Sequence, residues 1–581
     1  MPAVHEVAKR AGVGSIQWIE QQFVDRKVSK RVYEGPVRFE QTRRGLAIDL
    51  PEQNPVAFVP CYRVNFAYLK PIESTQLLEE NGMAQTVKIH FDPNWESLSS
   101  YEVPEWYRDA KLGIWAHWSP QCVPEMGDWY ARNMYIQGHP QYQYHLEHYG
   151  HPSRFGYKDI CHLWTAANWD IEGLITRYKR AGAKYFTALG NHHCNFDAWN
   201  SRHHQWNSVN VGPKKDIVGG WAKVARAQEL RFGVTIHSTP SRTWRQFFPV
   251  TFGADKDGPL AGVPYDGNLT KEDGQGLWWE GLDPQELYTR PHPCGSDPDL
   301  AFVENVILRV KDVIDQYHPD LLYFDDALQP VSDLGTYLGM QDIAPEIAAY
   351  YYNASLDWYK KMDVVLNVKD VPAHLQKAVV QDMERKRFSA IEPYPWQTDT
   401  CIGEWHYRRG FRYKGVSEKV VDLIDIVSKN GNMLLNIPMR GDGTIDEEEE
   451  RFLDGFTKWM DINSEGIYGT RPWMVYGEGP STQNTGTIGD SEQVAYTAQD
   501  IRFTQKGNDL FAFLLAWAAD GTAIIQSLKA GSRVPAEQIQ AIHLLGTPGE
   551  LIWHQDEQGL HVQMPAQKPC EHAYNLKIKR K

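Results

Sequence analysis

The chain has 581 residues, a formal net charge of -14 and an apolar fraction of 42%. The length allows about three or four domains, and the acidic balance without a basic stripe argues against a nucleic-acid partner. No apolar run approaches the ~18–20 residues of a membrane span, so we expect no membrane partner.

The cysteines and the N-terminus bear on the compartment. Seven cysteines are scattered along the chain without a Cys-x-x-Cys pair, which predicts neither a disulfide framework nor a thiolate zinc site. The first residues lack the roughly 7–15-residue apolar core of a signal peptide. We therefore expect a cytoplasmic protein, or a periplasmic or secreted one if a leader was removed.

Aromatic residues make up 12% of the chain, with 21 tryptophans and 29 tyrosines. Aromatic rings offer an apolar face and, in Trp and Tyr, a polar edge, which suits contact with both the C–H groups and the hydroxyls of a sugar. An aromatic-rich core is the alternative interpretation, and composition leaves both open.

Residues 1–100 contain strand-like segments at 37–40, 56–59 and 87–91. Their apolar and β-branched residues predict some β structure. We interpret this region as an N-terminal extension to the main domain.

Residues 101–474 alternate between short apolar runs and amphipathic stretches. Apolar runs at 112–116, 185–189 and 231–236 are followed by histidines, and helical periodicity marks 171–182, 219–230 and 302–317. Later strands are predicted at 364–368 and 378–380. Strands that alternate with helices over about 350 residues predict a parallel barrel or a doubly wound sheet.

The most informative stretch runs from His318 to Asp326. Pro319 ends a helix, residues 321–324 form a buried-strand pattern, and two adjacent carboxylates, Asp325 and Asp326, follow. In a barrel of this type the C-terminal ends of the strands carry the chemistry. The alternative is that these acids cap the next helix or pair with an arginine.

Residues 475–581 lose the helical signal. Short apolar segments at 510–517, 523–526, 539–545 and 560–564 are separated by turn residues. This pattern predicts a C-terminal antiparallel β-sandwich.

The residues at the predicted strand ends indicate a sugar-cleaving site. They are His117, His192, His193, His237, Asp325 and Glu384. One carboxylate would attack the anomeric carbon and the other would protonate the leaving oxygen, while histidines bind hydroxyls. A metal site is the alternative, but adjacent residues of a strand, such as His192 and His193, point to opposite faces.

Seven motifs, in order along the chain, resemble those of one known family. Residues 111–118 and 127–135 resemble K-F-G-I-F-x-H-W and G-E-W-Y-x-x-x-M-Y. The other matches are residues 155–159, 186–201, 319–325, 395–402 and 428–437. The family is that of the α-L-fucosidases of glycoside hydrolase family 29, and the resemblance covers about 105–475 densely.

The resemblance implies a (β/α)8-like barrel over 101–474, a β-sandwich over 475–581, and a retaining double displacement without metal or cofactor. It places the nucleophile at Asp325, because the family's aspartate directly follows an aromatic pair. Glu384, in a sequence similar to the D-x-E-R-G of many bacterial members, matches the acid/base, with Glu392 and Asp399 as competitors. The alternative for Glu384 is a surface ion pair with Arg385 or Arg387.

The resemblance also implies a set of substrate-binding residues. They are His117, Asp128, Trp129, His192, His193, His237, Tyr323 and Trp396. The chain departs from the family at Asp128, where Glu is usual, and at Lys386, where Gly is usual.

The function these features imply is that of a retaining exo-α-L-fucosidase acting on fucosylated oligosaccharides or glycoconjugates. Two alternatives remain: the same machinery acting on a related sugar such as an α-L-galactoside, and a non-catalytic fucose-binding protein. The sequence leaves the linkage preference and the oligomeric state open.

Overall fold

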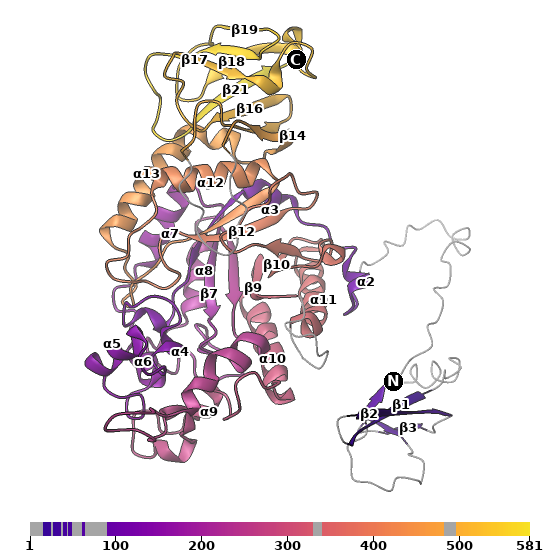
Figure 1. Ribbon diagram of the computed structural model, residues 1–581, viewed down its shortest axis with the longest axis vertical. Coiled ribbons are helices and arrows are strands. Elements are labelled where there is room, and N and C mark those ends of the chain that lie inside the picture. The colour runs from indigo at the N-terminus through magenta and orange to yellow at the C-terminus, as the bar shows by residue number, and fades with distance from the viewer. Residues whose placement is uncertain are drawn as a thin grey trace. The chain divides into compact units, whose positions relative to one another are not determined.

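A computed structural model describes residues 90–328, 340–481 and 495–581, and the backbone of five strands between residues 16 and 63 (Figure 1). The chain divides into two compact units, Met1–Lys88 and Ile89–Lys581.

In the first unit, β1 (Ile16–Val24) pairs antiparallel with β2 (Lys27–Gly35) and β5 (Cys61–Arg63), and β3 (Phe39–Thr42) pairs with β4 (Gly45–Ile48). The strand expected at 37–40 overlaps β3. The segment at 56–59 and residues 87–89 lie outside the described residues, and residues 90 and 91 are not in a strand.

Within the described part of the second unit, eight parallel strands close into a barrel, as predicted. Each strand pairs with the next along the chain, and the last pairs with the first. They are β6 (Leu112–Ala116), β7 (Tyr185–Asn191), β8 (Arg231–Ile236), β9 (Leu321–Ala327), β10 (Val365–Lys369), β11 (Val380–Asp382), β12 (Trp396–Cys401) and β13 (Gly431–Asn436).

Six longer helices surround the strands: α7 (Ile171–Arg180), α8 (Ile217–Ala227), α10 (Leu300–Tyr317), α11 (Met340–Tyr359), α12 (Val416–Ser428) and α13 (Glu447–Asn463). Shorter ones are α2 (Trp95–Leu98), α3 (Glu105–Ala110), α4 (Tyr130–Asn133), α5 (Pro140–His148), α6 (Tyr157–Leu163) and α9 (Pro284–Leu287). Neither β10 and β11 nor β11 and β12 are joined by an α-helix among the described residues, so the barrel is (β/α)8-like. No described helix is long and apolar enough to cross a bilayer.

Helix α10 shows how the sequence sets these elements. The Asp299 side chain accepts a hydrogen bond from the Phe302 N–H and so caps the N-terminus. Valines at 303, 306, 310 and 313 are buried at helical spacing. His318 adopts φ 44°, in the left-handed region, and ends the helix just before β9.

Side chains of the strands alternate between two apolar layers. Leu321 and Tyr323 of β9 belong to the cluster that fills the barrel interior with Trp115 and Tyr185, whereas Leu322 and Phe324 pack in the larger core beneath the helices. Because alternate residues share a face, Asp325 points inward like Tyr323 and lies at the rim formed by the C-terminal ends of the strands.

The C-terminal domain is antiparallel throughout, as predicted. One sheet has the order β14–β15–β16–β21–β18 and the other β17–β20–β19. Their bounds are β14 (Arg471–Glu478), β15 (Ile501–Lys506), β16 (Asp509–Leu514), β17 (Thr522–Ile525), β18 (Ile539–Leu544), β19 (Trp553–Gln555), β20 (Leu560–Gln563) and β21 (Tyr574–Arg580). The domain has an apolar core of its own and packs against α12 and α13 (Figure 1).

A buried charge cluster joins this domain to the barrel. Arg502 Nε of β15 lies 2.7 Å from Asp425 Oδ1 of α12, and Lys429 Nζ lies 2.7 Å from Asp425 Oδ2. Burial would raise the pKa of Asp425, but Lys429 and Arg502 outweigh it and lower that pKa. Asp425 is thus ionised and compensates two buried cations.

We expect Asp425→Asn to lower the free energy of unfolding by about 3–5 kcal/mol, because it leaves buried cations uncompensated. Denaturant unfolding of the variant and of Glu346→Gln measures this. Glu346 pairs with Lys311 on the surface, where such a pair contributes about 0–1 kcal/mol. Equal losses in the two variants would contradict the expectation.

Candidate active site

The rim formed by the C-terminal ends of the barrel strands gathers polar side chains from six strands. His117 follows β6, His192 and His193 follow β7, and His237 follows β8. Asp325 and Lys369 lie near the ends of β9 and β10, and Glu384 lies two residues after β11. The predicted strand-end residues therefore meet in space.

Lys369 connects the two proposed catalytic carboxylates. Its Nζ contacts Asp325 Oδ1 and lies 2.7 Å from Glu384 Oε2 and 3.5 Å from Asp399 Oδ2. One oxygen of Asp325 and one of Glu384 lie within 4.8 Å of each other. Glu384 is the more exposed of the two, with 33% of its side chain accessible, and Trp405 Nε1 donates to its Oε1 at 3.1 Å.

The surroundings favour an ionised Asp325. Burial would raise the pKa of its carboxyl, but Lys369, His237 and His193 together hold that pKa well below its usual value. His237 Nδ1 and His193 Nε2 lie 3.0 and 3.3 Å from Asp325 Oδ2. An ionised carboxylate is the form that a nucleophile requires.

Tyr323 lies beneath these carboxylates, with its hydroxyl 3.4 Å from Asp325 Oδ1, and its role in substrate binding stays a prediction. It is fully buried, and its hydroxyl lies 3.1 Å from both Asp382 Oδ2 and Asp399 Oδ2. A phenol donates one proton, so the second contact requires a proton on a carboxyl group. Burial raises the pKa of Asp382 and of Asp399, which favours a proton on one of these two carboxyl groups. Asp399 thus belongs to the buried hydrogen-bonded group beneath the rim.

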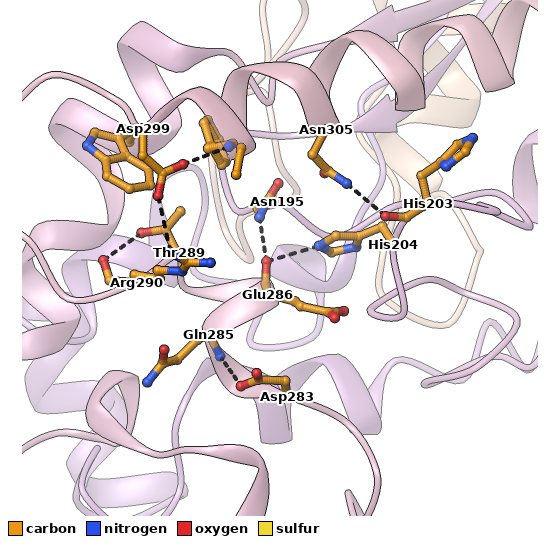
Figure 2. Close-up of a pocket in the computed structure, with 13 residues that line it drawn as sticks. Asn195, His203, His204, Asp283, Gln285, Glu286, Thr289, Arg290, Asp299 and Asn305 are labelled. Atoms are coloured by element: carbon orange, nitrogen blue, oxygen red, sulfur yellow. Dashed lines mark hydrogen bonds and ion pairs between the residues drawn. The ribbon is translucent and has the colours of Figure 1, made fainter. Parts of the chain in front are cut away.

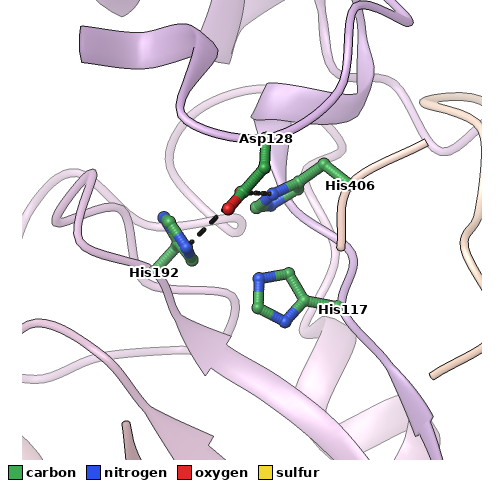
Figure 3. Close-up of side chains that lie close together, drawn as sticks. All are labelled: His117, Asp128, His192 and His406. Atoms are coloured by element: carbon green, nitrogen blue, oxygen red, sulfur yellow. Dashed lines mark hydrogen bonds and ion pairs between the residues drawn. The ribbon is translucent and has the colours of Figure 1, made fainter. Parts of the chain in front are cut away.

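A second group consists of His117, Asp128, His192 and His406 (Figure 3). Gln121 fixes the tautomer of His192: its Oε1 accepts the Ala131 N–H, so its amide N–H donates to His192 Nδ1 at 2.8 Å. The proton of a neutral His192 is therefore on Nε2, which lies 3.7 Å from Asp128 Oδ1. His192 thus presents a hydrogen-bond donor at the rim.

His406 is committed to its neighbours in the same group. Its Nδ1 lies 2.6 Å from Asp128 Oδ1, and its Nε2 lies 2.8 Å from Ser119 Oγ. A metal ligand needs a bare ring nitrogen. His192 Nε2 carries a proton and both nitrogens of His406 are engaged, so this donor set fits a hydroxylated ligand better than a metal ion.

His192 and His193 face the same site, although adjacent strand residues would not. Strand β7 ends at Asn191, and the rings of the two histidines lie 4.5 Å apart beyond it. Both side chains can therefore reach one ligand, contrary to the prediction from strand alternation, and it is the proton on His192 Nε2 that disfavours a metal ion.

Both ring nitrogens of His117 and the Nε2 of His237 are buried without a hydrogen-bond partner, whereas His237 Nδ1 faces Asp325. Burial lowers the pKa of His237 to about 4, and burial with neighbouring histidines holds the pKa of His117 well below its usual value. Neutral imidazoles both donate and accept, as sugar hydroxyls do. Because buried polar atoms are rarely left unpaired, these nitrogens point to a polyhydroxylated ligand.

Trp129 lies at this rim and Trp396 does not. Trp129 is partly exposed and packs against Phe247 and His193, with ring centroids at 5.4 and 5.8 Å. Trp396 begins β12 in the buried core, and its Nε1 donates to Lys429 O. The structure therefore places Trp396 away from the rim at which its substrate-binding role was predicted, because it lies at the N-terminal end of a barrel strand. Glu392, whose N–H also bonds Lys429 O, lies at that same end.

A cavity of about 330 Å³ lies beside the loop after β7 and the start of α10 (Figure 2). Asp283, Glu286 and Asp299 line it together with Arg290. None of the predicted catalytic or substrate-binding residues lines this cavity, so it is separate from the rim site.

A barrel whose rim combines two carboxylates within 4.8 Å of each other and neutral histidines has the arrangement of a glycoside hydrolase. Comparison with known proteins specifies the family. The α-L-fucosidase family model matches residues 78–465, and that of the α-L-fucosidase C-terminal domain matches residues 493–579. The chain belongs to the α-L-fucosidase family and is a glycoside hydrolase.

Individual relatives agree with this assignment. The tissue α-L-fucosidases of Homo sapiens and Rattus norvegicus are 26% and 27% identical, over 84% of this chain and 91% and 92% of theirs. The crystal structure of Thermotoga maritima α-fucosidase in complex with fucose superposes with a TM-score of 0.63 at 26% identity, covering 84% of this chain and all of that one.

The buried histidines predict how stability depends on pH. In the unfolded chain their pKa returns to about 6.5, so below that pH the unfolded state binds protons that the folded state does not bind. We expect the melting temperature to fall as the pH drops from about 6.5 towards about 4, and to fall less steeply in His237→Gln. Thermal unfolding across this range measures it, and parallel curves for the two proteins would count against it.

Proposed function

We propose that the chain is a retaining exo-α-L-fucosidase that releases terminal α-L-fucosyl residues from glycans or glycoconjugates. The observation that carries the proposal is the approach of Asp325 and Glu384 oxygens to within 4.8 Å. Carboxyl groups of retaining glycosidases lie ~5–5.5 Å apart, whereas inverting enzymes need about 6.5–9.5 Å to admit a water.

In the first step an Asp325 oxygen attacks the anomeric carbon and forms a glycosyl ester. The bond to the leaving oxygen breaks, and Glu384 gives that oxygen a proton. The exposure of Glu384 supports this role, because a leaving group departs towards solvent.

In the second step Glu384, now a carboxylate, takes a proton from water. The hydroxide oxygen attacks the anomeric carbon, and the ester bond to Asp325 breaks with its electrons returning to the carboxylate. Both steps invert the anomeric carbon, so the product keeps the configuration of the substrate.

Lys369 assists because it has an anionic partner at each stage of the reaction. In the free enzyme it contacts both carboxylates. Esterification neutralises Asp325 just as Glu384 gains a negative charge, so the ammonium stays paired at Glu384 through the intermediate. This keeps one buried cation compensated throughout the cycle.

The neutral histidines and Trp129 would hold the sugar. His117, His192 and His237 offer donors and acceptors to its hydroxyls, and the exposed part of Trp129 offers an apolar surface to the C5-methyl face. Solved structures of T. maritima α-fucosidase with fucose and with a mechanism-based inhibitor support fucose as the sugar bound.

We expect Asp325→Ala to lose several orders of magnitude in hydrolysis of p-nitrophenyl α-L-fucoside, because no ester can form. Azide is small enough to occupy the space of the carboxylate and should restore p-nitrophenolate release, with a β-fucosyl azide as product. Asp326→Ala is the matched control, since Asp326 is turned to Ser241. An Asp325→Ala variant with wild-type activity would overturn the assignment.

For Glu384→Ala, the expected loss depends on the leaving group. A natural sugar leaving group needs a proton, so hydrolysis of a fucosyl disaccharide should fall about 10²–10⁴-fold. The first step with p-nitrophenyl fucoside, whose leaving group is a weak base, should suffer much less. Single-turnover rates on both substrates test this, and an equal loss on the two would refute Glu384 as the acid.

A further inference from the structure

Behind the rim histidines lies a buried ion pair that touches no proposed catalytic group. Arg309 of α10 donates from Nε to Asp197 Oδ2 at 3.0 Å and contacts Asp197 Oδ1 through a second nitrogen. Arg309 is 2% exposed and Asp197 is fully buried. A forked contact of this kind fixes the carboxylate in both distance and orientation.

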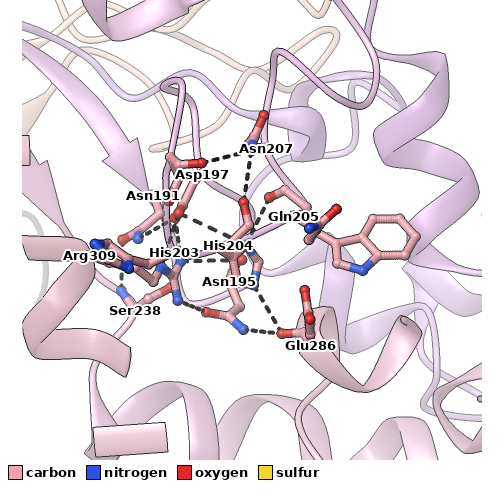
Figure 4. Close-up of polar contacts among 12 residues, drawn as sticks. Asn191, Asn195, Asp197, His203, His204, Gln205, Asn207, Ser238, Glu286 and Arg309 are labelled. Carbon is pink, nitrogen blue, oxygen red and sulfur yellow. Dashed lines mark hydrogen bonds and ion pairs between the residues drawn. The ribbon is translucent and has the colours of Figure 1, made fainter. Parts of the chain in front are cut away.

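Asn191, the last residue of β7, is hydrogen-bonded to this ion pair and connects it to the site (Figure 4). Its Nδ2 donates to Asp197 Oδ1 at 2.9 Å. Its Oδ1 accepts the backbone N–H groups of His237 and Ser238 at 3.1 and 3.0 Å. One side chain therefore joins the loop after β7 to the end of β8.

The end of β8 in turn holds the histidines of β7. His193 Nδ1 donates to the His237 carbonyl at 2.7 Å, and Ser238 Oγ donates to the His192 carbonyl at 2.9 Å. The three rings lie 4.5–5.5 Å apart. Every link from Arg309 to the three histidines is thus a hydrogen bond between buried groups.

We propose that Arg309, Asp197 and Asn191 are positioning residues that set the spacing of His192, His193 and His237 for the sugar. The inference rests on the proposed function, because the histidines matter for binding only if the site holds a sugar. The backbone ladder between β7 and β8 ends at the Asn191–Ile236 pair and the bond from the His237 N–H to Asn191 O, so the residues beyond it depend on side-chain links such as Asn191. Misplacement of rigid binding groups by about 1 Å weakens binding and rate steeply.

The test is Asn191→Ala, which cuts the link and leaves the Arg309–Asp197 pair in place. We expect KM for p-nitrophenyl α-L-fucoside and Ki for fucose to rise about 10–100-fold. Arg309→Lys keeps the buried charge but loses the fork, and should lie between wild type and Asn191→Ala. Lys311→Met is the matched control, since it removes a surface cation from the same helix.

Active-site titration and melting temperature separate positioning from folding. A purely structural role would lower the melting temperature and the fraction of active sites while leaving KM and Ki at the Lys311→Met values, and that result would overturn the inference. An inactive wild type that binds no fucose would instead refute the proposed function.

Discussion

The active site depends on one ammonium group, that of Lys369, between two carboxylates. Asp325 and Glu384 oxygens within 4.8 Å of each other would repel if both were ionised in a buried setting. Lys369 contacts both and lies near Asp399, and these acids outweigh burial and hold its own pKa well above the usual value. The cation is therefore permanent. The parallel pairing of β10 with β9 and with β11 makes this possible, because it places the C-terminal ends of the three strands side by side.

The polar atoms in the two halves of the site differ in how many of them have a hydrogen-bond partner. On the carboxylate side, Lys369 contacts Asp325, and Lys369 and Trp405 donate to the two oxygens of Glu384 already in the free enzyme. On the histidine side, nitrogens of His117 and His237 are buried without a partner. Burying an unpaired polar group costs stability, so folding alone does not explain this arrangement. A ligand that supplies hydroxyls does explain it, and functional sites are where folding rules are most often broken.

Strand-end reasoning predicted much of this from the sequence. Apolar runs followed by His117, His193, His237 and Asp325 predicted a parallel barrel or a doubly wound sheet, and the family resemblance selected the barrel. Most of the rim then followed, because strand ends of a parallel barrel converge. The same rule, applied strictly, would have placed Trp396, which begins its strand, and Tyr323, whose side chain lies below the rim, outside the rim itself. It would also have selected Lys369, which ends β10. Trp405 and His406 were out of reach, since they lie four and five residues beyond β12 and depend on how that loop folds back.

The loop after β12, which carries Trp405 and His406, also explains how the chain accommodates Asp128, where the family has the longer glutamate. The shorter carboxylate is held by His406 Nδ1 at 2.6 Å, and its backbone is fixed by contacts of its N–H with Glu404 and of its carbonyl with Gln141. The neighbouring Trp405 donates to Glu384. Residues 404–406 thus hold Asp128, at the end where the sugar hydroxyls would bind, and Glu384, at the end where the leaving group would depart. Because this one loop contacts both groups, it helps to set the distance from the hydroxyl-binding end to Glu384, together with Lys369 of β10, which holds Glu384 from the barrel.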